Sequence, residues 1–242
     1  MKNNLLTLLF LLTMPGCWLR AQDLEEILME HYNAAAQVKM TSMETMVIHG
    51  RTVFSSIDLE SPFTQYRMRP DKIRMESEYQ QFRVTQVYNG ENGWIYAPGM
   101  GIEEVKKLTA EELHTLLNQA EFENPLWNYK VYERTIELIS EPGNAGAHQL
   151  KCTMAGGDVI YFLIDRETYL ISSYITRQVM GGTENEIEVI LDEYRSAKGI
   201  PVARKIKTRI NGEVVTTVHV EKVEFNRNLD PALFEKPVPE EE

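Results

Sequence analysis

The chain has few cysteines, with only Cys17 and Cys152 among its 242 residues. Two cysteines cannot build the disulfide framework of a small secreted domain or a four-cysteine zinc site. The five histidines are scattered, and no two of them stand four residues apart as ligands on one helix face do. We therefore expect neither a metal nor a cofactor, and we expect Cys152, in an apolar run, to be a small buried side chain.

Catalytic motifs are also missing. The sequence has no G-x-S-x-G elbow, no phosphate-binding loop and no G-x-G-x-x-G, and Gly99-Met100-Gly101 lacks the strand-to-helix context of such a loop. No pair of carboxylates stands out among the 36 acidic residues. These absences favour a protein that is not an enzyme.

Beyond the N-terminus there is no apolar run of 18 or more residues, so a spanning helix is not expected. Residues 1–22 have a basic start, an apolar stretch and small residues near the end, which is the layout of a secretory signal. We expect cleavage after Ala21 or Gln22 and an exported product. The alternative is a lipoprotein cut before Cys17, although Met14 and Pro15 suit that site poorly.

Positive charge is scarce, since 25 Lys and Arg face 36 Asp and Glu for a net charge of −11. Loss of Lys2 and Arg20 with the signal would lower the net charge by two, to −13. Such an acidic chain is a poor partner for nucleic acid or an anionic lipid surface. No Pro/Gly/Ser-rich linker divides residues 23–242, which we take as one domain.

Two amphipathic helices are predicted. The first starts at Asp23 as N-cap and places Leu24, Ile27, Leu28 and Tyr32 on one face. The second lies in "LTAEELHTLLNQAEF", where Thr109 and Glu112 form a capping box. Its apolar stripe consists of Leu113, Leu116, Leu117 and Ala120.

Most of the remaining chain alternates apolar and polar residues with a period of two, from "TMVIHGRTVF" to "EVVTTVHVEKVEF". Tight turns such as Asn211-Gly212 separate these runs. About eleven strands with two covering helices predict a mainly β protein: an open, strongly curved antiparallel half-barrel. In "KIKTRI" the charged and apolar residues alternate, so one sheet face meets water and the other meets apolar side chains or a ligand.

The stretch "RMRPDKIRMES…VYNGENGWIYAP" resembles the outer-membrane lipoprotein-sorting family, the LolA-like proteins. The residues that carry the resemblance are Arg69-Pro70, Asn89-Gly90, Trp94, Tyr96 and Pro98, and the ending "FNRNLDPALFEKPVP" is also similar. The similarity extends over about residues 23–238. Its motifs are short, and this chain is longer and more acidic than the carriers of that family.

The resemblance implies an open antiparallel barrel that holds acyl chains of lipoproteins or lipids between the sheet and a helical lid. It implies Trp94 and Tyr96 on the apolar face, a lid bearing Leu113, Leu116 and Leu117, and Arg69 as a latch. It further implies the periplasm of a Gram-negative bacterium, a monomer, and possible partners in an inner-membrane export complex and an outer-membrane acceptor.

Two other interpretations remain open at this stage. A transmembrane barrel would need an outward apolar band, which Lys205, Lys207 and Arg209 interrupt. An interaction or sensor module of the cell envelope would have the same half-barrel, filled by its own side chains and docked to an export or signalling complex. Members of one fold can serve any of these roles.

Overall fold

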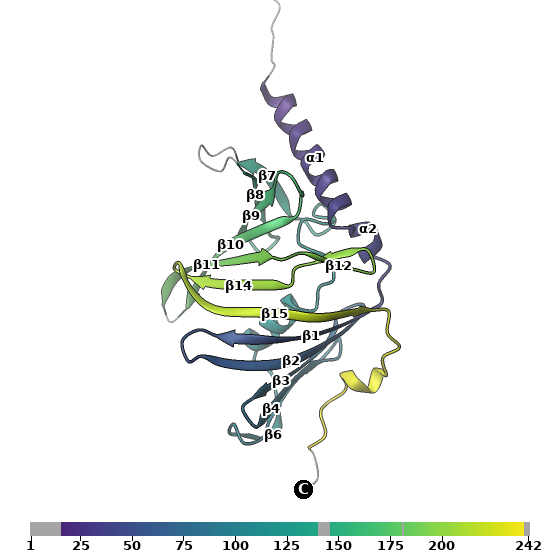
Figure 1. Ribbon diagram of the computed structural model, residues 1–242, viewed down its shortest axis with the longest axis vertical. Coiled ribbons are helices and arrows are strands. Elements are labelled where there is room, and N and C mark those ends of the chain that lie inside the picture. The colour runs from purple at the N-terminus through teal and green to yellow at the C-terminus, as the bar shows by residue number, and fades with distance from the viewer. Residues whose placement is uncertain (1–15, 140–145, 181, 240–242) are drawn as a thin grey trace, which may run out of the picture.

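Thirteen antiparallel strands form one continuous sheet in the computed structural model, which describes residues 16–139, 146–180 and 182–239. The spatial order is β6-β5-β4-β3-β2-β1-β15-β14-β11-β10-β9-β8-β7, so only the β1–β15 pair joins distant parts of the sequence. Figure 1 shows these strands stacked from β6 at the bottom to β7 at the top. The sheet does not close on itself, which confirms the open half-barrel.

The strands have the following bounds: β1 Thr45–Phe54, β2 Leu59–Met68, β3 Lys72–Tyr79, β4 Phe82–Tyr88, β5 Gly93–Ala97, β6 Ile102–Lys107, β7 Thr135–Ile139, β8 Ala147–Thr153, β9 Val159–Asp165, β10 Ile171–Met180, β11 Thr183–Asp192, β14 Lys205–Ile210 and β15 Glu213–Phe225. A separate hairpin consists of β12 Arg195–Ala197 and β13 Ile200–Val202. The helices are α1 Gly16–Ala34, α2 Gln37–Met40, α3 Ala110–Asn118 and the 3-10 helix η1 Pro231–Phe234.

The strand count is higher than the predicted eleven. The sequence pattern misses β6, whose residues "IEEVKK" do not alternate, and the three-residue strands β12 and β13. The prediction rests on alternation of apolar and polar residues. The charged residues of β6 interrupt this alternation, and β12 and β13 are too short to show it. The predicted Asn211-Gly212 turn is confirmed, with φ of 50° and 86° at its two residues, the left-handed values that a two-residue hairpin requires.

The first helix begins earlier than predicted. α1 runs without interruption from Gly16, so Asp23 does not start it, and the helix passes through the expected cleavage point after Ala21 or Gln22. Residues 1–15, which include most of the predicted signal, lie outside the described residues. In the described part of the chain, no helix is both long and apolar enough to cross a membrane.

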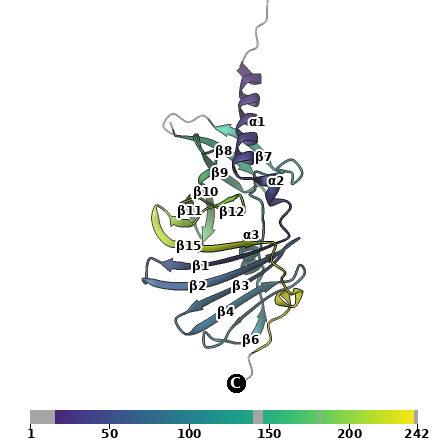
Figure 2. The ribbon, with the colours of Figure 1, turned by 45° about the vertical axis from the view of Figure 1, so that its right-hand side comes forward.

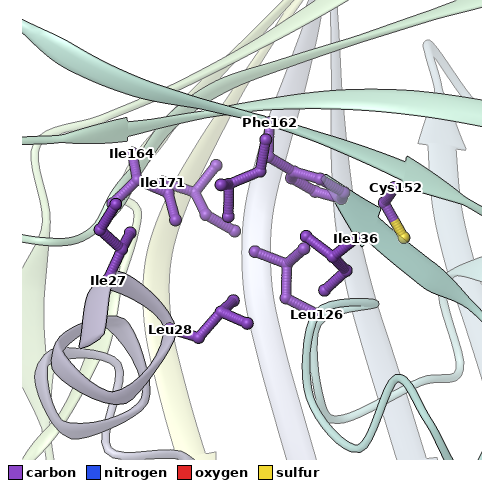
Figure 3. Packing of buried hydrophobic residues seen from close by; sticks show 9 residues of the cluster. Ile27, Leu28, Leu126, Ile136, Cys152, Phe162, Ile164 and Ile171 are labelled. Carbon is purple, nitrogen blue, oxygen red and sulfur yellow. The ribbon is translucent and has the colours of Figure 1, made fainter. Parts of the chain in front are cut away.

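The predicted face of α1 packs on the end of the sheet formed by β7, β8, β9 and β10. Ile27 and Leu28 contact a cluster that contains Leu126, Ile136, Leu150, Cys152, Phe162, Ile164 and Ile171. Figure 3 shows these side chains pointing toward one another between the helix and the strands. Cys152 is fully buried there, as predicted for a lone cysteine in an apolar strand.

Candidate hydrophobic-ligand site

The strand registers assign every residue of the large sheet to one of two faces. Starting from Ile73 beneath α3, cross-strand pairing continues through Arg67, Met46 and Phe225 on the same side. The same alternation links Phe54, Thr216, Thr208, Val189, Tyr174, Phe162 and Leu150. We call this side the helix face, because the clusters beneath α1 and α3 both lie on it.

The opposite side, the outer face, is polar at β11 and β14. Lys205, Lys207 and Arg209 lie on it, as the alternation in "KIKTRI" predicts. The Arg209 guanidinium lies 3.1 Å from Glu188, and the Lys205 ammonium lies 3.8 Å from Glu193. These ion pairs are typical of a solvated sheet surface.

The covers on the helix face leave part of it exposed. α1 covers β7 to β10, α3 covers part of β3 to β5, and a third cluster of Met43, Met46, Phe122, Ile200 and Phe225 lies between them. Apolar side chains on the same face of the central strands stay half-buried: Phe54, Phe63, Val189, Ile206, Ile210 and Val218. These six residues define what we call the open surface.

Gly50 shapes one part of the open surface. A Cβ atom at this position would lie 3.0 Å from Cζ of Phe63 and 2.4 Å from the carbonyl oxygen of His219. The Phe63 ring therefore lies directly over the backbone of β1, where a side chain would push it away. Nearby, the rings of Phe54 and Tyr79 lie 5.9 Å apart.

α3 is held over the sheet as the sequence predicts. The Thr109 side chain accepts from the N–H of Glu112, and the Glu112 carboxylate accepts from the N–H of Thr109, so the capping box is confirmed. Leu116 is buried against Ile73, and Leu113 lies over Gly93. Leu117 is half-buried.

Trp94 and Tyr96 were expected on the apolar face, and the structure places them on the other one. Gly93 faces Leu113 of α3, so strand alternation turns Trp94 and Tyr96 to the outer face. Tyr96 lines an outer hollow of about 210 Å³ beside the C-terminal segment, together with Arg74, Arg83 and Lys236. The spacing of the two aromatic residues showed that both lie on the same face of the strand, but it could not show whether this is the helix face or the outer face.

Arg69 connects three segments at the end of β2. Its Nε donates to the carbonyl of Met43 at 2.7 Å, and Nη2 donates to the carbonyl of Met40 at 3.2 Å and to Oε1 of Glu123 at 2.5 Å. The guanidinium also lies 4.4 Å from the centre of the Phe122 ring. Arg69 thus ties α2 and the short connection from α2 to β1 to the segment that follows α3.

Arg67 is a functional candidate that the sequence pattern did not indicate. It pairs with Met46 and Ile73 on the helix face, and its Nη1 donates to the carbonyl of Glu121 at 2.8 Å. Its Nε donates to Gln65, whose amide reaches Gln119 at the end of α3 at 3.0 Å. Burial lowers the pKa of Arg67 to about 10, so the group stays charged at neutral pH.

His31 and Tyr32 fix α1 to the loops around it. His31 Nδ1 lies 2.7 Å from the carbonyl oxygen of Tyr169, and Nε2 lies 3.1 Å from the amide nitrogen of Asn124. The Tyr32 hydroxyl donates to the carbonyl of Leu126 at 2.6 Å. Burial lowers the pKa of His31, which favours the neutral ring. Among the described residues, no three His, Cys, Asp or Glu side chains gather as a metal site requires.

Similar proteins are found at the level of structure. No family model matches the sequence, and no curated protein matches it. The chain is similar to a DUF1329 family protein from Desulfovibrio piger, with a TM-score of 0.59, 11% identity, and coverage of 86% of this chain and 97% of that one.

Two further solved structures are similar to this chain. An outer membrane lipoprotein-sorting protein domain from Vibrio parahaemolyticus has a TM-score of 0.58 and 11% identity, with 87% of this chain and 95% of that one covered. A LolA superfamily protein from Nitrosomonas europaea has a TM-score of 0.58 and 10% identity, with 88% and 97% covered. The chain therefore has the LolA-like fold, and the family resemblance seen in the sequence holds at the level of fold.

Proposed function

We propose that this protein is a non-enzymatic carrier that shields acyl chains of lipids or lipoproteins on its helix face, in the periplasm, for transfer to the outer membrane. The open surface is the observation that carries the proposal. Six large apolar side chains of the central strands stay half-buried there, while clusters beneath the helices cover the rest of the same face. A self-filled sheet would bury these side chains as it buries Phe162 and Phe225.

Transfer free energies indicate that such a carrier depends on controlled access to its site more than on high affinity. Burying a methylene group is worth about 0.8 kcal/mol both in a bilayer and in a protein cavity. Moving a chain from one to the other is therefore close to neutral, and exchange depends on access. We propose α3 as the lid and Arg69 as the latch, because Arg69 holds the residues that follow α3.

Mass spectrometry of the secreted protein, purified without detergent, tests the proposal. We expect a co-purifying lipid or acylated species and uptake of a fluorescent fatty acid by the delipidated protein. A protein without any such species that also takes up no fatty acid would favour the interaction module, in which the sheet only docks to a membrane complex.

Two neighbouring residues of β15 supply a matched pair of variants. Val218 lies on the helix face and Thr217 on the outer face, and both are half-buried. Val218→Asp places a charge on the open surface and should abolish uptake, whereas Thr217→Asp should leave it unchanged. Equal uptake by both variants would count against this surface as the ligand site.

A separate variant tests the proposed latch. We expect Arg69→Leu to change the rate of uptake, and a normal rate would exclude Arg69 as the latch.

A further inference from the structure

Arg67 is a half-buried charged group on the helix face. Arg67 projects between Met46 and Ile73, which are 5% and 0% exposed. A guanidinium on an apolar surface is normally paired with a carboxylate. In the part of the chain that the structure describes, no carboxylate pairs with Arg67.

The carboxylates of Glu121 and Glu123 are each close to an arginine other than Arg67. Glu121 offers Arg67 only its backbone carbonyl, and its carboxylate lies 3.7 Å from Arg134. The carboxylate of Glu123 is paired with Arg69, which lies two residues further along the chain, just past the end of β2. The chain has 36 acidic side chains, so the missing partner does not reflect a shortage of acids.

Arg67 also retains hydrogen-bonding capacity. A guanidinium has five N–H donors, and Gln65 and the Glu121 carbonyl each take one. Across the described residues, the other three donors, including both on Nη2, have no partner. Gln65 and Glu121 hold the planar group in place, as is needed for it to bind a carboxylate through two parallel hydrogen bonds.

The position of Arg67 relative to the open surface suits a ligand with an anionic head. Phe63 lies four residues before Arg67 on the same face of β2, and Leu59 lies eight residues before it. At about 3.3 Å per residue, this leaves roughly 26 Å of strand between Arg67 and Leu59. One acyl chain spans half of a bilayer core, about 15 Å, which is shorter than this distance.

We infer that Arg67 is the head-group anchor of the site, and that the ligand is a single acyl chain ending in an anion such as a fatty-acid carboxylate. This inference rests on the proposed acyl-chain function. It also narrows that function, because acyl chains joined through an ester or amide carry no charge at that end and would leave Arg67 unpaired.

Calorimetric titration with dodecanoate and with dodecan-1-ol tests the inference, since the two ligands share a chain and differ in charge. We expect the wild-type protein to bind dodecanoate at least tenfold more tightly than the alcohol. Arg67→Met should lower the affinity for dodecanoate to about that for the alcohol, and Arg67→Lys should retain part of the preference. Arg51→Met, on the outer face of the neighbouring strand, is the control and should behave like the wild type.

The outcomes separate the two proposals. Binding of both ligands with equal affinity by the wild-type protein overturns the anchor and leaves the acyl-chain function standing. A preference for dodecanoate that persists in Arg67→Met also overturns the anchor. Binding of neither ligand overturns the function and the anchor together. If Arg67→Met fails to fold, Arg67→Lys takes its place, and an undiminished preference in that variant overturns the anchor.

Discussion

The two helices on the helix face cover it to very different extents. α1 packs into a cluster of nine buried residues and is further fixed by hydrogen bonds from His31 and Tyr32 to surrounding loops. Figure 2 shows it at the end of the sheet formed by β7, β8 and β9. α3 packs into a cluster with only three buried members, Ile73, Leu116 and Ala120. α1 is therefore the more extensively packed cover, and α3, the proposed lid, is the less extensively packed one.

The first prediction concerns the core beneath α1. Phe162 is 2% exposed, and Phe162→Ala leaves a cavity among well-packed neighbours. We expect a loss of about 3–5 kcal/mol in the free energy of unfolding, measured by urea denaturation. A loss of about 2 kcal/mol or less would show that this cover is no more tightly packed than that of α3.

The second prediction concerns the smaller cover. Leu116→Ala removes the main buried side chain of α3, and we expect a local loss of about 2 kcal/mol, since the cluster is small. Hydrogen exchange should accelerate in residues 110–118 and remain slow in β8 and β9. Faster fatty-acid uptake should accompany this opening. Equal acceleration in β8 and β9 would mean that the two covers unfold as one unit.

The third prediction concerns pH. Burial lowers the folded-state pKa of His31 below the ordinary value of 6.5, so the unfolded chain binds the additional proton more readily. Stability from the neutral ring is therefore present above pH 6.5 and is lost as the pH falls toward the folded-state pKa. The Asn124 amide cannot simply reverse, because its oxygen accepts from the N–H of Leu126. Protonation therefore leaves buried polar groups unpaired, which costs about 1–3 kcal/mol.

Thermal unfolding from pH 7.5 to 5 measures this effect. His31→Gln should flatten the dependence on pH. His148→Gln is the necessary control, because burial and Arg166 also lower the pKa of His148. If His148→Gln removes the pH dependence of stability and His31→Gln does not, His31 is not the group whose protonation lowers stability.

The smallest predicted effect is at the start of α3. Thr109→Ala removes the capping box and should cost about 1 kcal/mol of local stability. Exposed Thr183, whose side chain caps no helix, is the matched control, and Thr183→Ala should change stability by less than about 0.5 kcal/mol. Exchange rates in residues 110–118 distinguish the two.

The sequence was informative where side-chain periodicity and local hydrogen bonding decide the structure. Period-two alternation predicted β1 and β3 with their full bounds, and the spacing of Thr109 and Glu112 predicted the cap of α3. The face of the sheet on which a side chain lies was harder to predict, because it depends on the register of the whole sheet. Trp94 and Tyr96 belong to a strand whose glycine, Gly93, lies beneath α3, and no local pattern reveals this. Arg67 also went unnoticed, since an isolated arginine in a strand is ordinary until its neighbours are known.

An open sheet has two free edges, and β6 is one of them. Its residues include Glu103, Glu104, Lys106 and Lys107. Charges along an exposed edge discourage another chain from adding a further strand. The feature that hid β6 from the sequence pattern thus also limits self-association. Replacing these four residues with alternating valine and threonine would make the strand easy to predict from sequence and would also create a starting point for fibrils.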